Sequence, residues 1–155
     1  MAPTYAKTTT VTVEKSQAEI RRIFARYKAT GFMFAERGDN ALCAFECRGR
    51  NIVLPVPMPT RRPVSIAVQR FGSRYEMEAA QRQAETKQEA AYQQEIRQRW
   101  RVLILLLKAK LEAIELGVSS FDDEFLSYTM LPSGRTVSQE LHGQLHERAF
   151  PQTAR

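Results

Sequence analysis

Two pairs of residues in this sequence have the spacing of metal ligands. His142 and His146 are four residues apart, as two histidines are when they bind zinc from one face of a helix, and Cys43 and Cys47 are also four apart. The cysteines, however, fall within a predicted strand, where the side chains of residues i and i+4 are about 13 Å apart. They therefore cannot bind one zinc ion or form a disulfide in an intact strand, and the sequence predicts no metal site.

Asp122, Asp123 and Glu124 form an acidic run that could in principle hold Mg²⁺. Consecutive side chains on a helix point in different directions, and negative charge is favoured in the first turn of a helix. We therefore interpret this run as the start of a helix. The sequence contains no nucleophile elbow, Walker A motif or dinucleotide-binding loop. It predicts no catalytic residue and no cofactor; it leaves open whether the protein is an enzyme and favours a role without catalysis.

A basic segment is the main functional signal. The net charge is +6, and residues 48–74 contain six arginines and no acidic residue. Such local positive charge suggests a polyanionic partner, first of all nucleic acid, and neighbouring aromatic rings could stack on the bases of a single strand. A solvated surface loop is the alternative interpretation. The predicted nucleic-acid-binding residues are Arg48, Arg50, Arg61, Arg62, Arg70, Arg74, Phe71 and Tyr75.

Residues 1–58 predict a β-α-β-β-β unit, a small antiparallel sheet with one packed helix. Residues 8–13 are rich in β-branched side chains and predict the first strand. Ser16 and Glu19 have the spacing of a capping box, so a helix is expected to start at Ser16 and to stop before Gly31. The apolar face of that helix contains Ile20, Ile23, Phe24 and Tyr27. The three later strands are expected over 32–36, 41–48 and 51–56.

A Pro- and Arg-rich connector over residues 59–74 separates this unit from a helical region over 75–150. A short edge strand over 64–68 is compatible with the alternating pattern there. One long helix is predicted from Tyr75 to Leu116, because strong helix formers fill it and Gly117 follows. Two short helices are expected next, starting at Ser119 or Ser120 and at Ser138. The predicted fold class is α+β, with the helical region packed on the N-terminal unit or on a partner.

The two halves of the long helix differ in character. The second half has an apolar stripe made of Ile96, Trp100, Leu103, Leu107, Leu111 and Ile114, which predicts a core with Trp100 as its largest side chain. The first half is polar nearly all round. We expect it to be ordered by self-association or by a partner, with a frayed, solvated helix as the alternative. The expected contacts are Met77, Ala80, Ala84, Ala91 and Tyr92.

The expected compartment is the cytoplasm. The first residues contain no apolar core of the length that a signal peptide needs. The longest strongly apolar run, Val102 to Leu107, is far shorter than the ~20 residues of a membrane span, so no membrane association is expected. Only two cysteines occur, which argues against a secreted scaffold held by disulfides.

Three stretches together carry a resemblance to other proteins: residues 11–20, 97–112 and 121–137. Through them the chain resembles a set of small uncharacterised proteins of phages, prophages and mobile elements. That set has no assigned activity, so the resemblance implies a viral or mobile-element context and no functional residues. The favoured function is a nucleic-acid-binding accessory protein, preferring single strands. The alternative is an inhibitor that binds a host defence protein or sequesters a small signalling nucleotide.

Overall fold

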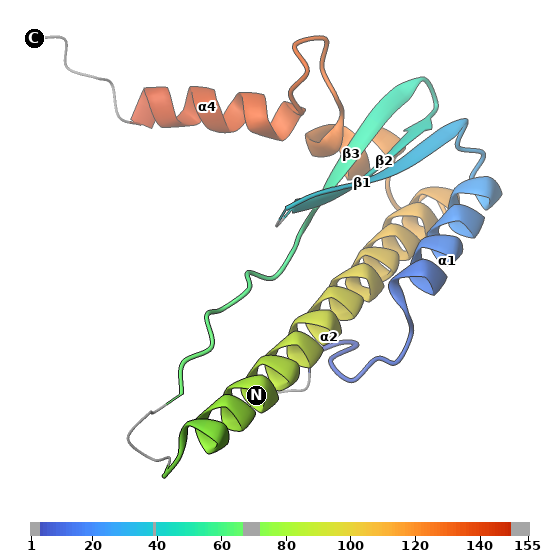
Figure 1. The fold of residues 1–155 in the computed structure, drawn as a ribbon. Coiled ribbons are helices and arrows are strands. Elements are labelled where there is room, and N and C mark those ends of the chain that lie inside the picture. The colour runs from blue at the N-terminus through green and yellow to red at the C-terminus, as the bar shows by residue number, and fades with distance from the viewer. Residues whose placement is uncertain (1–3, 39, 67–71, 150–155) are drawn as a thin grey trace, which may run out of the picture.

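The computed structural model describes residues 4–38, 40–66 and 72–149. Figure 1 shows a small sheet, a long helix crossing beneath it, and shorter helices at both ends of the chain. This arrangement has the α+β class that the sequence predicts. The elements are α1 (Val13–Arg26), β1 (Gly31–Arg37), β2 (Asn40–Cys47), β3 (Arg50–Pro57), α2 (Arg74–Glu115), α3 (Phe121–Phe125), the 3₁₀ turn η2 (Leu126–Tyr128) and α4 (Val137–Ala149).

The strand expected over residues 8–13 is wrong. Residues 5–8 form a turn, residues 9–12 have no regular structure, and Val13 is already helical. The backbone carbonyls of this segment are satisfied by α2 instead of by a strand: the amide of Gln94 donates to the carbonyls of Lys7 and Thr9 at 3.0 and 2.9 Å. A backbone carbonyl needs a hydrogen-bond donor, and the side-chain amide of Gln94 supplies it here. The described part of the chain therefore has an α-β-β-β start.

Both expected ends of α1 are also wrong by about one turn. Thr12 is the N-cap, because its hydroxyl accepts from the N–H of Lys15, and Ser16 lies fully buried inside the first turns. At the other end Lys28 has a positive φ of 58°, and the N–H of Ala29 donates to the carbonyl of Phe24. These bonds form a Schellman motif, which satisfies the last carbonyls. The helix therefore ends at Arg26, about one turn before the expected end beside Gly31.

The three predicted strands are confirmed, and they form an antiparallel meander in the order β1-β2-β3. The register aligns Phe34, Cys43 and Leu54 on one face of the sheet. Arg48 and Gly49 connect β2 to β3 with φ angles of 52° and 71°. Positive φ at both residues matches the twist of a tight hairpin, and Gly49 adopts it without the steric cost that Arg48 incurs.

The outer edge of β3 is poorly suited to pairing with another strand. The N–H of Met130 donates to the carbonyl of Asn51, so Asn51 directs its backbone away from β2. Because backbone direction alternates along a strand, Pro55 and Pro57 direct theirs outward too. Proline has no N–H, and this edge therefore lacks two of the donors that another strand would need.

The long helix is confirmed almost to the residue. Ser73 caps it by accepting from the N–H of Glu76, and the carboxylate of Glu76 accepts from the N–H of Gly72. At the other end the N–H of Val118 donates to the carbonyl of Ala113, with Gly117 at a φ of 70°. No helix in the described ranges combines the length and the apolar character that crossing a membrane requires.

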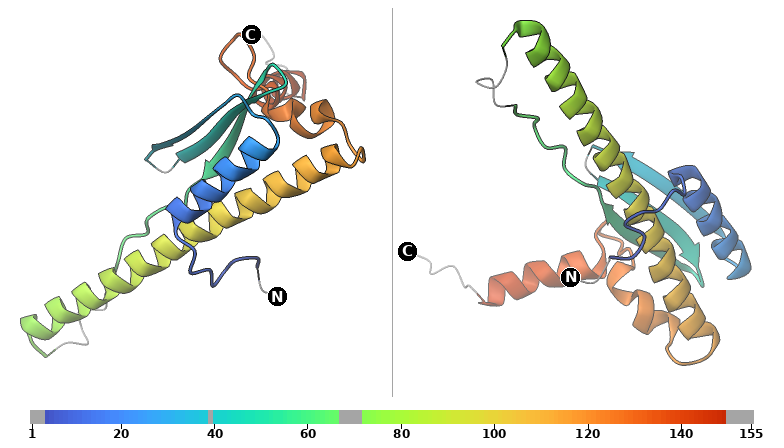
Figure 2. Two further views of the ribbon diagram at one scale, coloured as in Figure 1. Left: turned by 90° about the vertical axis from the view of Figure 1, so that its right-hand side faces the viewer. Right: turned by 90° about the horizontal axis from the view of Figure 1, so that it is seen from below.

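The C-terminal helices are shorter than expected or differently capped. The helix begun at Ser120 ends at Phe125 and continues only as η2, because Thr129 pairs with Ile52 as an isolated bridge. The last helix is capped by Thr136, not by Ser138: Thr136 accepts from the N–H of Gln139, and the side chain of Gln139 accepts in return. Figures 1 and 2 show α4 extending away from the sheet.

One hydrophobic core joins the N-terminal unit to the helices. α1 and the second half of α2 lie side by side on the same face of the sheet, and α3 closes its end (Figure 2). Trp100 is completely buried, and its ring meets Phe34 edge-on with 5.5 Å between centroids. The other buried α2 residues are Leu103, Ile104, Leu107 and Leu111. The apolar stripe predicted for this half of the helix therefore packs directly on the sheet.

Candidate nucleic-acid interface

The predicted basic residues that lie closest to the core are those of the β2–β3 turn. Arg50 forms a bidentate ion pair with Asp122 of α3, with N–O distances of 2.7 and 2.9 Å. Arg48 lies over the ring of Phe121, with its guanidinium carbon 5.5 Å from the ring centroid. Arg50 holds the hairpin against α3, so part of its charge is already compensated.

The connector arginines lie farther along the molecule, where residues 58–66 run beside α2 (Figure 1). Arg61 is ion-paired with Glu89 and its guanidinium lies 4.2 Å from the ring centroid of Tyr92. The hydrogen bond between Arg61 and Glu89 favours the charged form of both groups. It lowers the pKa of Glu89 and raises the pKa of Arg61. Arg62 is exposed, and the described residues give it no ion-pair partner.

The remaining predicted residues are near the start of α2. Arg74 is paired with Glu78 at 2.9 Å, and Tyr75 is 76% exposed. Arg70 and Phe71 lie outside the described residues. The six described members of the predicted set are thus spread in space from the β2–β3 turn to the far tip of α2, and three of them, Arg50, Arg61 and Arg74, are ion-paired. These six are not brought together into one site.

A denser group of cations lies on the outward face of α1. Lys15, Arg22 and Arg26 are at i, i+7 and i+11, which puts them within about 40° of one another around the helix. Arg21 lies about 100° from Arg22 around the helix, on the side of β1, and Lys28 follows the end of the helix; all five side chains are exposed. No carboxylate within the described ranges forms an ion pair with any of them. This face of α1 therefore carries positive charge that is not compensated locally.

Aromatic rings border these cations. The guanidinium of Arg21 lies 5.7 Å from the ring centroid of Phe32 and 5.9 Å from that of Phe34. Phe32 is 48% exposed at the start of the edge strand β1. Sequence reasoning missed this contact, because the helix and the strand that form it meet only through packing. The available signal was the alternation of Phe32 and Phe34, which places both rings on one face of the strand.

Two arginines on the second half of α2, Arg97 and Arg101, form side-chain hydrogen bonds within the protein. Glu19 of α1 accepts from both Arg101 and Lys108, and the hydrogen bond from Lys108 is the largest cause that lowers the pKa of Glu19. The guanidinium of Arg97 donates to the side chain of Gln94. The contacts of Glu19 attach α1 to α2, whereas the outward cations of α1 stay exposed.

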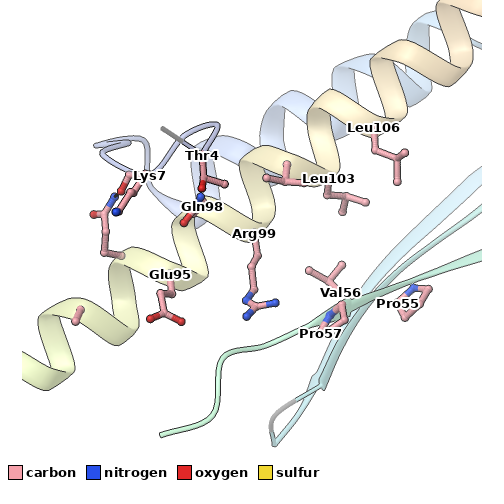
Figure 3. Close-up of a pocket in the computed structure, with 13 residues that line it drawn as sticks. Thr4, Lys7, Pro55, Val56, Pro57, Glu95, Gln98, Arg99, Leu103 and Leu106 are labelled. Carbon is pink, nitrogen blue, oxygen red and sulfur yellow. Dashed lines mark hydrogen bonds between the residues drawn. The ribbon is translucent and has the colours of Figure 1, made fainter. Parts of the chain in front are cut away.

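A groove lies between α2, the end of β3 and the N-terminal segment, with a volume of about 650 Å³. Figure 3 shows Arg99 pointing from α2 into the space beside Val56 and Pro57. The Nε atom of Arg99 is buried and has no hydrogen-bond partner in the described structure. The apolar walls are Pro55, Val56, Pro57, Val102, Leu103 and Leu106, and the other charged residues are Lys7 and Glu95. We call this the α2–β3 groove.

The acidic run does not form a common site. Asp122 is paired with Arg50, Asp123 accepts from the hydroxyl of Ser120 at 2.6 Å, and Glu124 is paired with Lys110 at 2.8 Å. The hydrogen bond from Lys110 lowers the pKa of Glu124. Each carboxylate thus has its own structural contact, and the interpretation of the run as a helix start is confirmed by the cap at Ser120.

The cysteines and histidines are likewise separated. Cys43 and Cys47 are both buried on β2 with free thiols, and burial raises the pKa of Cys43 to about 12. His142 is exposed on α4, whereas both cysteines belong to the core cluster. Within the described ranges, no three His, Cys, Asp or Glu side chains gather as metal ligands.

Comparison with known proteins adds no further constraint: no family model, curated protein or solved structure matches the chain.

Proposed function

We propose that the protein is a nucleic-acid-binding accessory protein of a phage or mobile element, acting in the host cytoplasm in replication, recombination or DNA protection. The outward cations of α1 carry this proposal: Lys15, Arg21, Arg22, Arg26 and Lys28 are exposed and have no ion-pair partner in the described structure. A phosphate backbone supplies the negative charge that this helix face lacks.

Single strands are the preferred partner in this proposal. Splayed bases stack on exposed aromatic rings and on the planes of arginine side chains, whereas the bases of a duplex are already stacked on each other. Phe32 offers such a ring beside Arg21, and both adjoin the cations of α1. The connector arginines contribute less, since Arg61 and Arg74 are ion-paired.

The triple variant Lys15→Gln, Arg22→Gln, Arg26→Gln should bind a labelled single-stranded oligonucleotide far more weakly than the wild type. Each lost phosphate contact reduces the slope of log affinity against log salt by about 0.7 for a single strand, so the variant's slope should be shallower by about 2. With four contacts the wild type should lose about 50-fold in affinity between 50 and 200 mM salt. Fluorescence anisotropy at both salt concentrations measures this, with the matching duplex in parallel.

A charge-matched control is available in the connector. The variant Arg61→Gln, Arg62→Gln, Arg74→Gln removes the same number of charges from residues that are largely ion-paired or distant from α1. It should retain most of the affinity. Equal losses in the two variants would show that only net charge matters, and a wild type that binds neither oligonucleotide at low salt would refute the proposed function.

A second candidate function is protein binding, and an apolar ridge on α2 favours it. The ridge consists of Leu105, Ala109 and Leu116, which lie opposite the core face of the same helix, together with Val102 and Leu106, which also line the α2–β3 groove. Leu105 is 46% and Leu116 is 70% exposed. A patch of exposed apolar side chains often marks contact with another protein, so this ridge is suited to such contact, including with the host defence protein of the alternative prediction.

Self-association is the simplest test of that ridge. The residues first expected to mediate it lie partly under the chain's own connector: Tyr92 is beneath Arg61, and Met77 borders the connector residues 64–66. We therefore expect contacts through the ridge, and Leu105→Asp should convert an oligomer at tens of micromolar to a monomer. Light scattering measures the mass, and an unchanged circular dichroism spectrum serves as the folding control. A wild type that is strictly monomeric would exclude self-association and leave host proteins to be sought by pull-down.

A further inference from the structure

The α2–β3 groove contains a cation that the protein itself does not satisfy. Arg99 is half-buried among apolar walls, its Nε is sealed from solvent, and none of the described residues accepts a hydrogen bond from it. Leaving a buried donor of a charged group unpaired is costly, because the group has lost its water without gaining an acceptor. An anion in the groove would pair with the rest of the guanidinium, and the surrounding apolar side chains would strengthen the pairing.

The shape of the groove suits a small molecule. Its volume of about 650 Å³ lies within the usual range of small-molecule sites. One wall is the N-terminal segment, which is fixed in place because Gln98 donates to the carbonyl of Tyr5 at 2.8 Å and Gln94 donates to Lys7 and Thr9. The opposite wall contains Pro55 and Pro57. These rigid surfaces are suited to a flat body.

A peptide strand is a poor occupant. An extended peptide binds a sheet edge through backbone hydrogen bonds, and the outward positions of β3 at this point are Pro55 and Pro57, which have no N–H to donate. The charge of the groove also selects the ligand: Lys7 and Arg99 oppose Glu95, which leaves an excess of one positive charge. A ligand with a single negative group balances it.

We infer that the α2–β3 groove is a binding site for a small amphipathic anion, with a flat apolar body and one phosphate, sulfonate or carboxylate. The body lies between β3 and the residues Val102 and Leu106, and the anionic group contacts the guanidinium of Arg99. This site is separate from the α1 cations, and nothing in the inference requires that nucleic acid binds there.

The probe 8-anilinonaphthalene-1-sulfonate tests the inference on the full chain. Its fluorescence should rise and saturate at one molecule per chain. Arg99→Met retains the apolar stem of the side chain and should weaken the probe at least about tenfold, the effect of losing a hydrogen bond to a charged group. N-phenyl-1-naphthylamine has the same rings without the sulfonate, and its affinity should change less than about twofold in the variant.

Two further variants complete the test. Leu106→Trp fills the groove and should abolish binding of both probes, whereas Arg62→Met removes an exposed arginine outside it and should change neither. The inference is overturned if Arg99→Met leaves the affinity for the sulfonate unchanged, or if binding does not saturate. It is also overturned if Leu105→Asp on the apolar ridge, and not Arg99→Met, removes the signal.

Discussion

Replacing Trp100 with alanine lowers the free energy of unfolding by about 3–5 kcal/mol, the range for deletion of a large buried aromatic side chain. Trp100 is the largest side chain with no exposed surface, and it contacts the sheet through Phe34. Its removal leaves a cavity at the point where α2 packs on β1, and neither rigid element can move far to fill it. Urea denaturation followed by circular dichroism measures the change in midpoint.

Two variants calibrate this result. Trp100→Phe keeps an aromatic ring and also removes an indole N–H that is buried without a partner, so it should cost less than half as much. Tyr75→Ala removes an aromatic ring that is 76% exposed near the start of the same helix and should change stability by less than about 0.5 kcal/mol. A Trp100→Ala variant as stable as Tyr75→Ala would place Trp100 outside the core.

The thiol of Cys43 should react with Ellman's reagent at least about 1,000-fold more slowly in the folded protein than in urea at pH 8. Burial raises its pKa from about 9 to about 12, and a difference of three units lowers the thiolate fraction by that factor. Complete burial of the side chain blocks the reagent as well. The measurement uses Cys47→Ala, so that Cys43 is the only thiol, and monitors absorbance with and without urea.

The reciprocal variant, Cys43→Ala, reports on Cys47, whose pKa burial also raises. The side chain of Cys47 is slightly exposed, whereas that of Cys43 is fully buried. Cys47 should therefore react faster than Cys43 but still more slowly than in urea. Fast labelling of Cys43 in the native protein would contradict the predicted packing of β2. The same pKa shift has a consequence for stability: the neutral thiol is the form that the core accepts, so its contribution is complete below about pH 9 and is lost as the pH rises from 9 toward 12.

Local sequence patterns were sufficient wherever a single period decides the structure. The alternation of Ala41, Cys43, Phe45 and Cys47 predicts a strand with one buried face, and all four side chains are buried. The run of helix formers up to Gly117 predicts α2 nearly to its ends, because propensity and the stop signal agree over many residues. The apolar stripe around Trp100 identifies the buried face for the same reason.

Patterns failed where two conformations are locally similar and a distant partner chooses between them. Residues 8–13 have the composition of a strand, but they form one only beside another strand. Here the amide of Gln94 donates to the carbonyl of Thr9, and Gln94 and Gln98 hold the preceding turn through the carbonyls of Lys7 and Tyr5. Ser16 has the sequence context of an N-cap, yet Thr12 already caps the helix one turn earlier. The N-cap is the residue at which the helical backbone begins. Contacts of the preceding residues with α2 help to fix that point.

The functional surface was decided almost wholly by tertiary structure. The sequence by itself determined that the protein is basic and that its arginines concentrate between residues 48 and 74. It could not determine which of these charges remain available, because the carboxylates that pair with Arg50 and Arg61 are 72 and 28 residues away. Tertiary packing also sets the contact of Arg21 with Phe32, the absence of ion-pair partners for the α1 cations among the described residues, and the position of Arg99 beside β3. Composition fixes the net charge of a segment. Whether an arginine is neutralised by a carboxylate depends on the distance between the two groups, and only the folded chain sets that distance for residues far apart in sequence.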